Sequence, residues 1–175
     1  MADVVTRAMQ PALGAIKLAW WCERLRELDE GKVPAEPRLQ AAAEQLLPRG
    51  IKGADLSEIE DGWLTLLEEL PDPERIAARG TALFGLAARL LGVDDQRVVR
   101  SGALFAVADV LRRSLRPDLP SPEIPKGSMP RRARPLTALA ALAARDLKHG
   151  GPPFEPEATP GRAWTLLRHR LTGRY

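Results

Sequence analysis

The chain has 175 residues, and its 26 basic and 23 acidic residues give a formal net charge of +3. This length suffices for the core of one domain, and the single cysteine, Cys22, excludes an intramolecular disulfide and a zinc site built from cysteines. Valine and isoleucine are scattered, and no apolar stretch reaches about twenty residues, so neither strands nor a membrane span is predicted. We therefore expect a cytoplasmic, all-α protein with one helical domain over residues 1–175.

The first predicted helix covers residues 3 to 29 and is interrupted near Pro11, because the residue before a proline disfavours helical geometry. At 3.6 residues per turn, one continuous apolar stripe contains Gly14, Leu18, Trp21, Leu25 and Leu28. A second apolar patch, confined to the first turns, contains Leu13, Ile16 and Trp20. We expect this end of the helix to be buried around most of its girth.

Two further helices are expected before residue 71. The first is short and covers residues 37 to 47. The second starts at Asp55, which together with Glu58 reads as a capping box, and continues to Leu70 with apolar residues at core spacing. We interpret Asp55, Glu58 and Asp61 as capping and surface residues rather than as a metal motif, since acids are favoured in first turns.

The next predicted helix runs from Pro73 to Gly92 and is unusually rich in small residues. Two of them, Gly80 and Gly85, each cost about 1 kcal/mol relative to alanine within a helix. Their presence predicts a close backbone approach by a neighbouring segment or by a ligand.

Asp94 and Asp95 are expected to cap a helix that continues to about Arg116, and Asp109 lies on its apolar inner line. An unpaired buried carboxylate is costly, so Asp109 should contact a cation. The available partners are Arg112 and Arg113 one turn on, or Arg79 and Arg89 on the preceding helix.

Residues 117–135 contain six prolines and predict an irregular segment, which includes the basic cluster Arg131, Arg132 and Arg134. A connection of this length is a lid, a docking segment or disordered. Helices are expected over residues 136–148 and from Pro160, after an N-cap at Thr159, which brings the total to about seven. His149 and His169 are interpreted as cations near helix C-termini.

Three segments stand out, LGAIKLAWWCERL, RIAARGTALFGLAARLLG and SGALFAVADVLRR. They resemble the squalene/phytoene synthase family, and the similarity covers about residues 5 to 116. The resemblance implies an N-terminally shortened helical domain of the isoprenoid-synthase type. Enzymes of that family hold Mg²⁺ with two aspartate-rich motifs, and the metal grips a prenyl diphosphate.

The sequence departs from the family at the metal motifs. The first motif would precede Asp3, and in the second the family's aspartates align with Arg113 and Pro117. Arg112 matches the family's arginine, Asp109 stands where the family has asparagine, and Lys17 lies where an enzyme of the family would handle phosphate. An arginine in place of a ligand repels Mg²⁺, so we expect no metal and no cofactor.

We therefore predict a catalytically inactive relative that acts by binding a protein partner or an isoprenoid or lipid, in the style of the family's branch that assists assembly of respiratory complex I. The alternative is a prenyl-diphosphate transferase, with Mg²⁺ or with arginine clamps on phosphate. A third hypothesis is a basic module that binds a membrane surface, including peripheral contact with the inner membrane, or nucleic acid. Binding to nucleic acid is not expected. If the domain is shortened by an N-terminal helix, homo-oligomerisation would cover the apolar surface that this helix would otherwise bury. The candidate binding residues are Lys17, Arg79, Asp109, Arg112 and Arg113.

Overall fold

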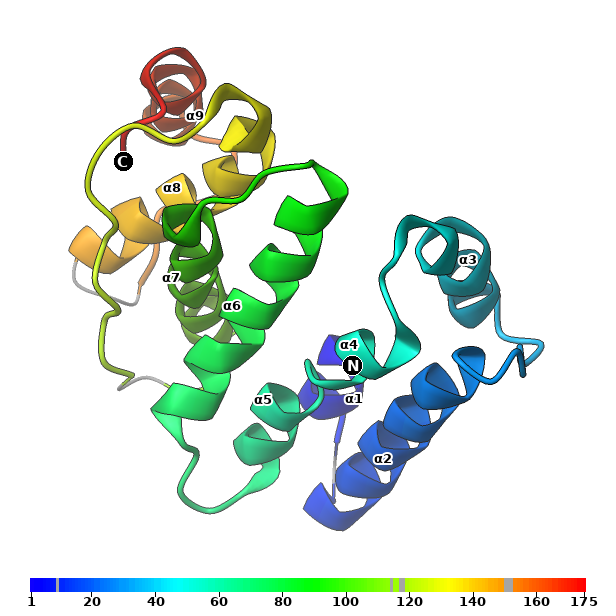
Figure 1. Ribbon diagram of the computed structural model, residues 1–175. Helices are drawn as coiled ribbons and strands as arrows, with labels where there is room; N and C mark the ends of the chain where they lie inside the picture. The colour runs from blue at the N-terminus through cyan, green and yellow to red at the C-terminus, as the bar shows by residue number, and fades with distance from the viewer. Residues whose placement is uncertain (9, 114, 117–118, 150–152) are drawn as a thin grey trace. The chain divides into compact units, whose positions relative to one another are not determined.

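The computed structural model describes residues 1–8, 10–113, 115–116, 119–149 and 153–175, and every regular element in these ranges is helical (Figure 1). The all-α prediction is confirmed. The α-helices are α1 (Ala2–Thr6), α2 (Pro11–Leu28), α3 (Pro37–Gln45), α4 (Gly53–Ser57), α5 (Asp61–Leu64), α6 (Pro73–Leu90), α7 (Gln96–Arg112), α8 (Arg134–Lys148) and α9 (Pro160–Thr172). Short 3₁₀ turns lie at η1 (Leu47–Arg49), η2 (Thr65–Leu67) and η3 (Arg131–Ala133).

The chain forms two compact units, Met1–Arg75 and Ile76–Tyr175. The prediction that residues 1–175 make a single domain stays a prediction. Among the described residues, none of the helices has the length and apolar character that crossing a bilayer requires. The helices outnumber the expected seven because the first predicted helix is interrupted before Pro11 and the third is divided.

In the first unit, α2 buries its predicted stripe against α3 and the turns that follow. Leu25 and Leu28 form a cluster with Leu39, and Trp21 packs partly buried against it. The second apolar patch differs from the prediction, because the side chains of Leu13, Ile16 and Trp20 are 52%, 65% and 43% exposed. The expectation that this end of α2 is buried around its girth is therefore wrong, since the described contacts cover only one face.

The single helix expected from Asp55 to Leu70 is wrong, and contacts with α2 explain the difference. Asp29 accepts hydrogen bonds from the backbone N–H groups of Gly53 (2.7 Å) and Ala54 (2.9 Å), so the helix begins two residues early. A Cβ at Gly53 would overlap the backbone of Leu25. The Asp55 carboxylate is not the N-cap and instead accepts from the Lys52 N–H at 3.2 Å.

In the second unit, α6 and α7 cross where two glycines face each other. A Cβ at Gly80 would overlap the carbonyl oxygen of Gly102, and the reverse is also true. The predicted close backbone approach is thus confirmed for Gly80, and the neighbour is a helix. At Gly85 a Cβ would meet only Val99 at 3.9 Å, an ordinary contact, so packing does not require glycine there.

Helix α7 forms the centre of the second unit and packs against α8, which packs in turn against α9 (Figure 1). Asp95 caps α7 and Thr159 caps α9, as predicted. The described part of the proline-rich segment is docked, because Met129 is buried and its N–H donates to the carbonyl of Gly173 at 2.9 Å. Pro117 and Asp118 lie outside the described residues.

Candidate functional site

A pocket of about 400 Å³ lies in the second unit between α7, α8 and the start of α9. Its apolar wall is formed by Phe105, Ala108, Leu139, Leu142 and Ala143. Its polar wall is formed by Asp109, Arg112, Asp146, Glu157 and Arg162. An apolar pocket with a few converging polar groups is the usual form of a small-molecule site.

Asp109 is held between two arginines at one side of this pocket. Its carboxylate lies 2.7 Å from the Nε of Arg113, one turn along α7, and 3.6 Å from a guanidinium nitrogen of Arg79. Arg79 is buried and also donates to the carbonyl oxygen of Ala106 at 3.0 Å. Burial lowers the pKa of Arg79 to about 10, and the charge of Asp109 opposes this shift. The predicted pairing of Asp109 with a cation is confirmed.

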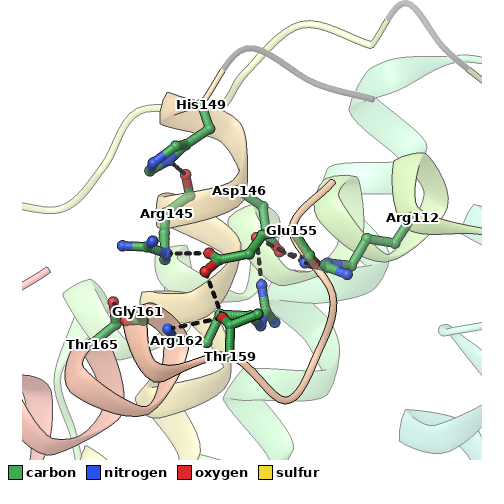
Figure 2. Close-up of polar contacts among 9 residues, drawn as sticks. All are labelled: Arg112, Arg145, Asp146, His149, Glu155, Thr159, Gly161, Arg162 and Thr165. Carbon is green, nitrogen blue, oxygen red and sulfur yellow. Dashed lines mark hydrogen bonds and ion pairs between the residues drawn. The ribbon is translucent and has the colours of Figure 1, made fainter. Parts of the chain in front are cut away.

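Asp146 is held in the same manner on α8, and Figure 2 shows its carboxylate between the guanidinium groups of Arg112 and Arg162. Arg112 donates from Nε at 2.6 Å and from a terminal nitrogen at 2.9 Å, so the pair is bidentate. Arg162 donates from its Nη1. Asp146 is 3% exposed, and its hydrogen bond raises the pKa of Arg112. This network joins α7, α8 and α9.

The chain ahead of α9 is attached to the same network. Glu155 accepts from Arg145 at 2.8 Å and from the hydroxyl of Thr159 at 2.5 Å, as Figure 2 shows. The hydrogen bond from Arg145 is the main cause that lowers the pKa of Glu155, and Thr159 adds to it. Arg112 donates to the Glu155 carbonyl at 3.0 Å and lies 5.1 Å from the centre of the Phe154 ring. These contacts attach the chain ahead of α9 to α7 and α8.

The sequence-predicted site residues fall into separate groups. Asp109 and Arg112 line the pocket. Arg79 and Arg113 do not line it but contact the carboxylate of Asp109. Lys17 is exposed and belongs to the first unit.

Arginine clamps on phosphate would require Arg79, Arg89, Arg112 and Arg113 to meet at one pocket, and of these only Arg112 lines this one. Arg89 lines another pocket of the second unit, together with Asp94 and Asp95.

Sequence reasoning missed Asp146 and Arg162, which contribute the most buried charges of the pocket. Asp146 follows the apolar residues Leu139, Leu142 and Ala143 of α8 at helical spacing. The rule that singled out Asp109, an acid on the apolar line of a helix, also applies to Asp146 and would have found it.

The interpretation of His169 as a cation is wrong. Its ring is fully buried and stacks on Tyr175 with centroids 5.3 Å apart. Nδ1 lies 3.1 Å from the carbonyl oxygen of Arg174, which only accepts, so Nδ1 carries the proton. Nε2 lies 2.9 Å from the hydroxyl of Thr137. Burial is the main cause that lowers the pKa of His169 and favours the neutral ring.

Among the described residues, no group of three or more histidine, cysteine, aspartate or glutamate side chains is arranged to hold a metal ion. Comparison of the chain with protein-family models, with characterised proteins and with solved structures finds no match.

Proposed function

We propose that this chain is a catalytically inactive, squalene/phytoene synthase-like helical protein that acts by binding, and that its ligand is an isoprenoid or lipid in the pocket between α7 and α8. The apolar wall formed by Phe105, Leu139 and Leu142 would receive the hydrocarbon part. A volume of about 400 Å³ suits a small amphiphile or one end of a longer one.

The observation that carries this proposal is the pairing of two carboxylates of the pocket, half-buried Asp109 and buried Asp146, with arginines. Asp109 contacts Arg79 and Arg113, and Asp146 contacts Arg112 and Arg162. Mg²⁺ that bridges a diphosphate requires several carboxylate oxygens and water. At this pocket such an ion would have to displace guanidinium groups from Asp109 and Asp146, because Glu157 alone does not supply several carboxylate ligands. This favours ligand binding over metal-assisted ionisation of a diphosphate.

The polar wall supplies a second, smaller support. The Nε of Arg162 is buried and has no hydrogen-bond acceptor within the part of the chain that the structure describes. A buried donor without a partner is costly, so an oxygen atom on the ligand would be favoured beside Arg162. The expected ligand is therefore a hydrocarbon chain that ends in a hydroxyl, carboxylate or phosphate.

Calorimetry with farnesol, farnesyl diphosphate and geranylgeranyl diphosphate, each with and without Mg²⁺, tests the proposal. We expect binding that does not depend on the metal and that Leu139→Asp weakens at least about tenfold, because it places a charge in the apolar wall. Leu90→Asp is the matched control, since Leu90 is 40% and Leu139 47% exposed. Metal-dependent micromolar binding, or release of diphosphate from either substrate, would overturn the proposal in favour of a prenyl-diphosphate transferase.

A further inference from the structure

Helix α9 has its apolar and polar faces reversed relative to an ordinary surface helix. The face buried against the rest of the second unit carries Arg162 and His169, which are 6% and 0% exposed. The face directed outward carries Trp164, Leu167 and Leu171, which are 65%, 46% and 69% exposed. These three residues follow one another at intervals of three and four, so they form one ridge along the helix. Water is an unfavourable environment for such a ridge.

Arginines flank this α9 ridge on both sides. Arg168 and Arg170 are exposed and lie on opposite edges of it by helical position. Arg170 also lines a groove of about 720 Å³ with Arg131, Arg134 and Leu171. Arg134 holds the end of α9 in place, because it donates to the carbonyl oxygens of Arg170 and Leu171 at 2.9 Å each.

The segments that form this surface have a single sign of charge. Residues 124–145 and 158–175 together contain nine lysines and arginines and neither aspartate nor glutamate, and two of the nine, Arg145 and Arg162, pair with Glu155 and Asp146. Basic side chains beside an exposed tryptophan and leucines are typical of helices that lie in the interface of a membrane. Charge complementarity therefore selects an anionic partner, and the α9 ridge requires that this partner also provide an apolar layer.

We propose that the α9 ridge and its arginines form a docking surface for the anionic face of a phospholipid bilayer. Trp164, Leu167 and Leu171 would enter the boundary between headgroups and acyl chains, and Arg168, Arg170 and Arg131 would contact lipid phosphates. Nucleic acid would satisfy the arginines but would leave the leucines in water. This surface lies on the opposite face of α9 from Arg162, so it goes beyond the proposed pocket ligand and does not depend on it.

Vesicle co-sedimentation of the full chain tests this proposal. We expect binding to vesicles of phosphatidylcholine and phosphatidylglycerol in roughly a three-to-one ratio, no binding to phosphatidylcholine alone, and loss of binding as salt rises. Arg168→Gln with Arg170→Gln should weaken binding about fivefold for each arginine removed. The matched control is Arg38→Gln with Arg49→Gln, which removes two exposed arginines of the first unit and should leave the affinity unchanged.

The ridge itself is tested by Leu167→Ala with Leu171→Ala, which should weaken vesicle binding at least about tenfold. Leu90→Ala with Leu91→Ala is the control, since both leucines are exposed, at 40% and 38%. The positions on the α9 ridge are exposed, so circular dichroism should show an intact fold. Tryptophan emission should shift to shorter wavelength on vesicles, and Trp164→Phe should abolish most of the shift although Trp20, Trp21 and Trp63 remain.

Three results would overturn the proposal. The first is equal binding to neutral and anionic vesicles, or no binding to either. The second is a concentration-dependent dimer, seen by light scattering, that Leu167→Ala with Leu171→Ala dissociates, because the α9 ridge would then contact a second copy. The third is binding to duplex DNA that Arg168→Gln with Arg170→Gln abolishes and that Leu167→Ala with Leu171→Ala leaves unchanged.

Discussion

The two compact units of this chain carry opposite net charges. Met1–Arg75 contains nine basic and fifteen acidic residues, which gives −6, whereas Ile76–Tyr175 contains seventeen basic and eight acidic residues, which gives +9. The units also differ in where their ion pairs lie. In the first, Arg75 pairs with Asp61 and Glu68, whose side chains are 55% and 43% exposed. In the second, Asp146 is 3% exposed.

This difference explains why the surface of the second unit is basic. Three of its acids pair with arginines: Asp109 with Arg79 and Arg113, Asp146 with Arg112 and Arg162, and Glu155 with Arg145. The remaining basic residues outnumber the remaining acids. The acids Asp109 and Asp146 and their arginine partner Arg112 line the pocket between α7 and α8. The exposed Arg168 and Arg170 flank the α9 ridge. The first unit has a leucine cluster and a helix cap from Asp29, and both proposed binding surfaces lie in the second unit.

The largest expected effect comes from Asp146→Asn, which leaves the charges of Arg112 and Arg162 without their shared partner. We expect the free energy of unfolding to fall by about 3 kcal/mol, because an uncompensated buried charge is costly. Urea unfolding of the full chain measures this value. Glu157→Gln, at an exposed position on the same pocket, is the control and should change stability by less than about 0.5 kcal/mol. Equal effects of the two substitutions would contradict a stabilising role for the buried Asp146 network.

The crossing of α6 and α7 gives the next largest effect. Gly80→Ala should destabilise the chain by about 2 kcal/mol, since its Cβ would overlap the backbone of Gly102. Gly85→Ala on the same helix should instead stabilise it by up to about 1 kcal/mol, because space is available and alanine favours the helix. Thermal unfolding of the two variants should therefore shift in opposite directions. A shared direction would contradict the described crossing.

In the first unit, Asp29→Ala should cost about 1 kcal/mol, because α4 would lose the carboxylate that accepts from Gly53 and Ala54. Its neighbour Glu30 is exposed and forms an ion pair with Lys32, two residues further along the chain, so Glu30→Ala serves as the control. Denaturant unfolding distinguishes the two. A loss at Asp29 as large as the loss at Asp146 would mean that capping stabilises the first unit as strongly as buried charge stabilises the second.

The smallest effect concerns pH and His169. Burial lowers the pKa of His169 from its ordinary value of 6.5, so below that pH the unfolded chain takes up a proton that the folded chain does not. Stability should be complete above pH 6.5 and should fall as the pH drops below it. His169→Gln should flatten the dependence of the melting temperature on pH between about 7.5 and 5.5. A steeper dependence in His169→Gln would contradict a buried neutral ring.

Elements with strong local signals could be predicted from the sequence. Pro73 and Gly92 bracket α6, Asp95 caps α7, and Thr159 with Pro160 starts α9, each by short-range rules. The start of α4 at Gly53 could not be predicted, because it depends on Asp29, which is distant in sequence and accepts hydrogen bonds from the first N–H groups of α4. Within the pocket, Asp109 was identified from its place on an apolar line, and Asp146 could have been found in the same way.

The sequence by itself determined that the chain is helical and that Asp109 requires a cation, and it predicted a close approach at both Gly80 and Gly85, of which only Gly80 has one. Each of these conclusions follows from interactions within a few residues or from the cost of burying one group. Only the tertiary structure decided which arginine meets which acid, and that Arg162 and His169 face inward while Trp164, Leu167 and Leu171 face outward on α9. Helical periodicity identifies residues that share a face, but the direction of that face depends on what the neighbouring helices offer. Here they offer Asp146 and Thr137, so the polar side of α9 is buried.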